Sequence, residues 1–136
     1  MSDVLVFPDA RAAVYDLIHK AEHEGQVIDA HYQMPVSEYG SAGGPFPLAV
    51  VEMEPGTQGF LDRTDRIVVT VYAEGSMPAA RIAESIHASL VGVDIEAPGD
   101  VYLDEIQPDQ PPHELAYYSE TINQVQFRIM VTTRPV

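Results

Sequence analysis

Residues 65–90 read DRIVVTVYAEGSMPAARIAESIHASL, and this stretch decides the fold. In residues 65–74 successive side chains point to opposite sides of an extended chain, and both sides carry apolar residues. This predicts a strand that is at least partly covered on both faces. Gly75 and Pro78 then open a helix whose apolar positions recur every three or four residues up to Leu90. The period of the pattern changes from that of a strand to that of a helix, which predicts a helix packed on a sheet.

The preceding part of the chain predicts one helix and two strands. Asp9 can cap a helix over about residues 9–24, and Gly25 supplies its end. Residues 27–34 and 48–54 are predicted to be strands, and we expect Pro55 and Gly56 to form the turn that ends the second of them.

The following part predicts two more strands, over residues 101–106 and 121–133. The prolines of residues 108–112 predict a loop that cannot be regular sheet. The predicted order is helix, three strands, helix, two strands, with no internal repeat. This order predicts an α+β fold, with a mostly antiparallel sheet of about five strands and two helices packed on it.

Length and composition predict one soluble folded domain over residues 1–136, with 46% apolar and 21% charged residues. No apolar run approaches the roughly 20 residues that a membrane span needs, and we expect neither a membrane anchor nor a secretion signal. Cysteine is absent, which excludes disulfides, thiolate metal sites and cysteine nucleophiles.

The charge balance is strongly acidic, with a formal net charge of −14. A surface that binds nucleic-acid phosphates is therefore not expected. Residues 82–127 contain no lysine or arginine at all, which predicts that one side of the fold is electronegative. Solubility alone is the simpler explanation of this charge.

One metal-ligand spacing occurs: His19, Glu22 and His23 match the H-x-x-E-H pattern of inverted zinc peptidases. These residues fall in the last turn of the predicted first helix, away from its apolar stripe, where histidines commonly interact with the helix dipole. We expect a solvated helix end there, with no metal and no cofactor.

Other catalytic arrangements are not found. Ser85, His87 and Ser89 are spaced by two, so on a helix they face different directions, and no G-x-S-x-G motif is present. The glycines around residue 43 lack the lysine of a phosphate-binding loop. The sequence therefore predicts a protein that is not an enzyme.

Three predicted connections are long for so small a domain: residues 35–45, 55–64 and 107–120. They carry apolar and aromatic side chains that interfaces favour, which we expect to contact other subunits or partners: Tyr39, Phe60, Leu61, Tyr117 and Tyr118. Arginines are scarce on this acidic chain, and we expect some of them to pair with carboxylates across subunit contacts: Arg63, Arg66, Arg81 and Arg128. Ordinary surface charges are the alternative.

The element order and several segments resemble the tail terminator proteins of long-tailed, siphovirus-type bacteriophages. The resemblance extends over nearly the whole chain and depends on arrangement more than on identity. It rests on an early helix, a Gly-Pro-Phe-Pro entry into a strand, an alternating strand, an alanine-rich helix and a long final strand: residues 10–23, 44–51, 67–73, 79–90 and 125–131.

The resemblance implies a homo-oligomeric ring, hexameric in this family, at the head-proximal end of the virion tail. Such a ring caps the major tail tube protein, stops tube polymerisation and joins the tail to the head connector protein, after assembly in the bacterial host cytoplasm. It implies no cofactor and no catalysis. DNA passes through the ring without specific binding, and we expect an acidic lumen to repel it, with these residues as candidates: Asp104, Glu105, Asp109 and Glu114.

The sequence is also compatible with two other functions. One is a different phage neck or tail-completion protein, which shares the assembly principle but occupies another level of the particle. The other is a cytosolic enzyme or ligand-binding domain with a pocket between helix and sheet, to which His31, Tyr32, Glu52 and Tyr72 would contribute polar groups.

Overall fold

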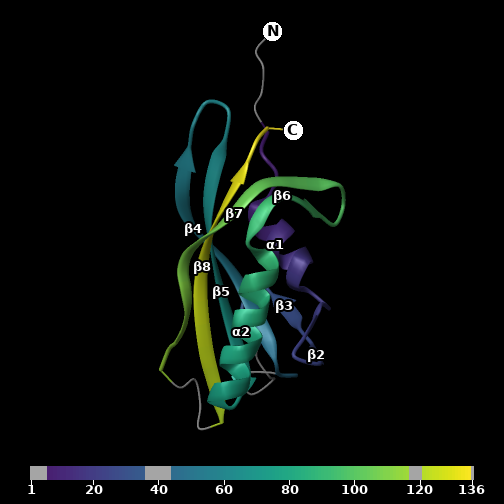
Figure 1. Cartoon of the computed structure of the whole chain (residues 1–136), viewed down its shortest axis with the longest axis vertical. Coiled ribbons are helices and arrows are strands. Elements are labelled where there is room, and N and C mark those ends of the chain that lie inside the picture. The colour runs from purple at the N-terminus through teal and green to yellow at the C-terminus, as the bar shows by residue number, and fades with distance from the viewer. Residues whose placement is uncertain (1–5, 36–43, 117–120, 136) are drawn as a thin grey trace.

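The computed structural model of the chain describes residues 6–35, 44–116 and 121–135 (Figure 1). Two helices, α1 (Ala10–Ile18) and α2 (Ser76–Leu90), pack on a six-stranded sheet with the order β3-β4-β5-β8-β7-β6. The sheet strands are β3 (Asp29–His31), β4 (Leu48–Gln58), β5 (Arg63–Glu74), β6 (Gly92–Ala97), β7 (Val101–Glu114) and β8 (Ile122–Thr133). A separate two-stranded hairpin is formed by β1 (Glu22–His23) and β2 (Gln26–Val27).

The predicted α+β class is confirmed, and the sheet has six strands instead of about five. The two central strands, β5 and β8, run antiparallel and pair along their whole lengths, with Ile67 opposite Ile129. All other strand pairs of this sheet are antiparallel except β3 with β4, which is parallel.

One face of the sheet and the two helices enclose the core (Figure 1). Ile67 and Phe127 from the sheet and Ile82 and Ile86 from α2 are at most 1% exposed. Full burial of each such side chain stabilises the fold by about 1.5–3 kcal/mol. The opposite face of the sheet carries polar side chains toward the end nearest the β4–β5 turn, among them Thr64, Arg66 and Thr132.

The first helix is shorter than predicted. It ends at Ile18, and His19 already has extended backbone geometry. The prediction of a helix to residue 24 was wrong because the apolar stripe that the sheet covers is complete at Ile18, and the polar residues after it form the β1–β2 hairpin around Gly25. The strand expected over residues 27–34 is correspondingly divided between β2 and β3.

The turn expected at Pro55 and Gly56 was also wrong. Strand β4 continues to Gln58, with a shift in its register against β5 between Glu54 and Thr57. The chain reverses at residues 59–62, where the Gly59 backbone N–H donates a 2.8 Å hydrogen bond to the Asp62 carbonyl. A bulge thus absorbs the two turn-forming residues without ending the strand.

Residues 108–112 lie within β7, contrary to the predicted loop, and β6 was not predicted. Along the described chain β6 pairs with β7 only as far as Ile106, so the later part of β7 has an unpaired edge. Prolines are tolerated there because an edge strand can lack N–H groups on its open side, and two register shifts against β8 accommodate them. Strand β6 escaped detection because Asp94, with φ of +50°, interrupts its alternation.

Candidate functional site

The β4–β5 hairpin presents two apolar side chains to solvent. Phe60 is 83% exposed and Leu61 is 70% exposed, at the tip of a hairpin that projects beyond the rest of the sheet (Figure 1). Exposed apolar side chains at a loop tip are typical of interaction surfaces. The predicted interface residues Tyr39, Tyr117 and Tyr118 lie outside the described residues.

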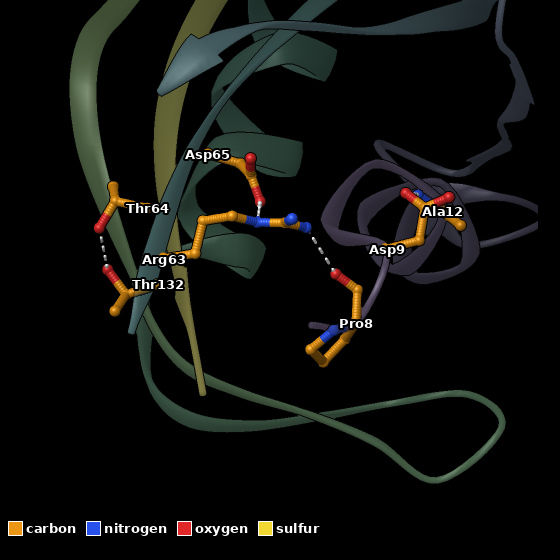
Figure 2. Close-up of polar contacts among 7 residues, drawn as sticks. All are labelled: Pro8, Asp9, Ala12, Arg63, Thr64, Asp65 and Thr132. Carbon is orange, nitrogen blue, oxygen red and sulfur yellow. Dashed lines mark hydrogen bonds and ion pairs between the residues drawn. The ribbon is translucent and has the colours of Figure 1, made fainter. Parts of the chain in front are cut away.

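Arg63, at the base of this hairpin, is occupied within the chain. Figure 2 shows its side chain between Asp65 Oδ2, to which Nε donates at 3.2 Å, and the carbonyl oxygen of Pro8, to which a terminal nitrogen donates at 3.3 Å. Its guanidinium group also lies 5.0 Å from the ring centre of Phe7. Arg63 therefore ties the hairpin base to the segment that precedes α1.

Arg66 lies on the sheet face opposite the helices and is exposed. It lines a surface hollow of about 330 Å³ together with the bulge residues of β4 and with Met130. Neither Arg66 nor Arg81 forms an ion pair with any residue that the structure describes. Among the described residues, Arg66 is thus a cation near the hairpin that has no ion-pair partner.

Arg128 joins three strands on the same face. Its Nε donates to Glu54 Oε1 at 2.8 Å, and a terminal nitrogen donates to Gln110 Oε1 at 2.5 Å and to Gln126 Oε1 at 3.2 Å. Gln126 in turn donates to Thr70 Oγ1 at 3.0 Å. Arg128 thus has a carboxylate partner, Glu54, in its own chain, and its pairing across a subunit contact stays a prediction.

The four predicted lumen acids have different surroundings. Asp104 pairs with Arg134 at 2.8 Å. Glu114 accepts hydrogen bonds from Ser76 at 3.2 Å and from Asn123 at 3.0 Å, which joins the end of β7 to the start of α2. The remaining acids are Glu105, which accepts a 2.7 Å hydrogen bond from Gln107, and Asp109, which is exposed.

A second hollow, of about 530 Å³, lies where β6 begins beside β7. Its lining includes Val91 and Val93, which are 37% and 67% exposed, together with Pro108 and Glu105. We call this hollow the notch. Sequence reasoning missed it because it missed β6; the signal was the apolar pair Val91 and Val93 on either side of a glycine.

The histidines of the H-x-x-E-H spacing do not share a helix. His19 accepts a hydrogen bond from the Ala30 backbone N–H at 3.0 Å. His23 is only 7% exposed, and its Nδ1 lies 2.8 Å from Ser85 Oγ. The solvated helix end predicted here was therefore wrong for His23, and burial lowers the pKa of this imidazole. Within residues 6–35, 44–116 and 121–135, no three histidine or acidic side chains converge as metal ligands.

Of the polar groups proposed for a pocket between helix and sheet, Tyr32 and Glu52 lie apart from each other. Tyr32 stacks on Tyr15 of α1, with ring centres 4.6 Å apart, whereas Glu52 is exposed on the sheet face opposite the core. The hollows beside Arg66 and at the notch are lined by other residues. In the described part of the chain, neither helix is long and apolar enough to cross a membrane.

Comparisons with known proteins find a likeness in fold and none in sequence family. No protein-family model and no curated protein matches the sequence. Among solved structures, the chain is similar to a chain of the "Virion of native gene transfer agent (GTA) particle", with a TM-score of 0.59 and 14% sequence identity. The match covers 92% of this chain and 94% of that one. At this identity the likeness shows a shared fold, and it extends over nearly the whole of both chains.

Proposed function

We propose that this chain is a structural virion protein that acts as a tail terminator. One domain of residues 1–136 closes with identical copies into a ring, hexameric as in the resembling family, at the head-proximal end of the tail. The ring caps the tail tube, stops its polymerisation and joins it to the head connector. The observation that carries this proposal is the fold shared, over 92% of the chain, with a component of a gene transfer agent virion.

The distribution of surfaces supports a ring. A head-to-tail contact between identical subunits needs two different surfaces on each subunit. The exposed hairpin tip at Phe60 and Leu61 is one such surface, and the notch beside Val93 is another. The histidines of the H-x-x-E-H spacing do not support a shared metal site, because His19 accepts from the Ala30 backbone and His23 lies beside the Ser85 hydroxyl.

The acidic composition supports a bore that DNA passes without binding. Phosphates and carboxylates repel each other, over a distance limited to about 8–10 Å by salt. Only acids on the bore wall therefore act on DNA. Asp109 is the strongest candidate, because it is exposed and has no ion-pair partner among the described residues, whereas Asp104 and Glu114 are held within the chain.

Tube assembly tests this function. The full chain is purified and mixed with the major tail tube protein of the same virus, and the products are viewed by negative-stain electron microscopy. We expect rings with a central hole at one end of each tube, and tubes that stop growing once capped. Binding at another level of the particle would favour a different neck protein, and a ligand-induced thermal shift without any assembly would favour the ligand-binding reading.

DNA passage tests the acidic bore separately. Particles assembled with Asp109→Asn are expected to release DNA more slowly than particles assembled with Asp16→Asn, a matched neutralisation of an exposed acid on α1. Equal release rates for the two variants would remove Asp109 from the bore wall.

A further inference from the structure

We infer that the β4–β5 hairpin tip of one copy inserts into the notch of the next copy, with Arg66 facing Glu105 across the contact. The inference rests on the proposed ring and specifies the two surfaces that form it. The inserted side chains are Phe60 and Leu61, and the receiving side chains are Val91, Val93 and Pro108.

The first argument is apolar complementarity. Phe60 and Leu61 are the most exposed large apolar side chains among the described residues, and Val93 is also two-thirds exposed. Burial of such surface contributes roughly 25 cal/mol per Å². The described part of the chain buries neither the tip nor the notch, so a contact between copies removes both from water at once.

The second argument is charge. The hairpin side of the sheet carries Arg66 without a described ion-pair partner, whereas the notch lies within residues 82–127, which contain no cation. Glu105 lines the notch, and the side chain that donates to it, Gln107, carries no charge. Two notches would repel each other, whereas the end of the hairpin, where Asp62 and Asp65 are balanced by Arg63 and Arg66, is not repelled by a notch. This assigns Glu105 to the contact and not to the bore.

The third argument is the placement of the two surfaces. The hairpin and β6 lie at opposite sides of the sheet, separated by β8 and β7 (Figure 1). A contact from one side of a subunit to the other side of the next is heterologous, and it closes into a ring when the rotation per subunit allows. Pro108 lacks a backbone N–H beside the notch, which disfavours extension of the sheet by another strand and leaves side-chain insertion.

Cysteine cross-linking tests this contact directly, because the native chain has no cysteine. Full chains carrying Leu61→Cys and Val93→Cys are mixed at increasing concentration, oxidised and separated on a non-reducing gel. We expect at least a fivefold excess of the mixed disulfide dimer over a control mixture of Val27→Cys and Met77→Cys chains, which are comparably exposed elsewhere. The double variant, with both cysteines in one chain, should give a ladder of higher oligomers.

Two results would overturn the contact. One is cross-linking no greater than in the control mixture at the highest concentration, and the other is equally strong cross-linking of Leu61→Cys chains alone, which indicates a two-fold contact between hairpins. Rings that form on tubes without this cross-link would refute the contact and leave the terminator function intact. Efficient cross-linking into open chains, with no ring on any tube, would support the contact and refute the ring.

Charge exchange provides an independent measurement. Arg66→Glu and Glu105→Arg are each expected to weaken association by about tenfold, and the two variants mixed or combined should recover most of it. Arg81→Glu, which changes an exposed arginine on α2 with no described ion pair, is the matched control and should have little effect. Failure of the combined variant to recover association, with its fold intact by circular dichroism, would exclude the Arg66–Glu105 pair.

Discussion

A Cβ atom added at Gly56 would lie 1.8 Å from the carbonyl oxygen of Thr64 in the neighbouring strand. Real side chains never approach backbone so closely, so β4 can form its bulge only with glycine at this position. Gly56→Ala must displace one strand, and overpacking of this kind costs about 1–3 kcal/mol. Urea unfolding of dilute protein should show this loss as a lower midpoint.

Gly92→Ala is the matched control for Gly56, because an added Cβ meets nothing within 4 Å and the residue also lies in a strand. We expect its free energy of unfolding to remain within about 0.5 kcal/mol of the native value. Equal stability of the two variants would show that the bulge relaxes freely around a side chain added at Gly56.

Arg128 is expected to act within the subunit. Arg128→Ala removes hydrogen bonds to Glu54, Gln110 and Gln126, and should lower the free energy of unfolding by about 1–2 kcal/mol. Because the Arg128 and Glu54 side chains are 30% and 40% exposed, their coupling in a double-mutant cycle should be below about 1 kcal/mol.

The same cycle distinguishes intrachain from intersubunit pairing at Arg128. As a control, Arg81→Ala removes an exposed arginine that has no ion pair among the described residues. It should change the free energy of unfolding by less than about 0.5 kcal/mol. If the Arg128–Glu54 coupling appears only at concentrations at which the protein assembles, the contact belongs to the subunit interface.

Sequence patterns predicted the elements that the core requires. Strand β5, helix α2 and strand β8 were found because their buried side chains, such as Val69, Ile86 and Phe127, follow uninterrupted periods of two or 3.6 residues. Their pairing partners were found only in part, because β4 was predicted to end at residue 54 and the later part of β7 was predicted to be a loop. Strand β5, helix α2 and strand β8 are also elements on which the resemblance to tail terminators rests.

The errors lie where tertiary contacts override local signals. Pro55 and Gly56 resemble a turn, but pairing with β5 on one side holds them in a bulge. The prolines of β7 resemble a loop, but β8 pairs with one edge while the other edge needs no donors. Neither the bulge nor the continuation of β7 can be predicted from the local sequence, because each depends on which strand lies beside it.

Only part of the candidate site could be predicted from the sequence, because the rest depends on how the strands pack. The exposed tip at Phe60 and Leu61 follows from apolar residues in a predicted loop, whereas the notch requires the position of β6 against β7. The partners of charged residues are equally hard to predict from the sequence. Arg63 donates to Asp65 and also to the carbonyl oxygen of Pro8, which is 55 positions away in the chain. The sequence alone therefore cannot show which arginines are already paired within the chain.

The burial of His23 should make the stability of the fold depend on pH. Burial holds the pKa of its imidazole below the ordinary value of about 6.5, so the folded state favours the neutral ring. As the pH falls through 6.5 the unfolded chain takes up a proton before the folded chain does. The stabilisation present above that pH is therefore lost progressively, until the pH is below the folded pKa.

Unfolding free energies at about pH 7.5 and pH 5.5 test this contribution. His23→Gln retains a polar partner for Ser85 and removes the titration, so the decrease in stability toward low pH should be smaller than in the native chain. His113→Gln, on β7 beside the carbonyl oxygen of Pro111, is the control and should leave the decrease unchanged. An unaltered decrease in His23→Gln would assign the acid sensitivity to other groups.

Thr132 and Thr133 are adjacent residues of β8, but only the hydroxyl group of Thr132 has a hydrogen-bond partner among the described residues. Thr132 Oγ1 lies 3.1 Å from Thr64 Oγ1 on the outer face (Figure 2), whereas Thr133 Oγ1 is fully buried and has no hydrogen-bond partner among the described residues. A buried hydroxyl without a partner costs about 1–3 kcal/mol, and valine has nearly the same shape. Thr133→Val should therefore raise the free energy of unfolding by about 1 kcal/mol, and Thr132→Val should lower it by about 0.5–1.5 kcal/mol. Destabilisation by Thr133→Val would mean that its hydroxyl is satisfied after all, for instance by an ordered water at the end of the sheet from which the hairpin projects.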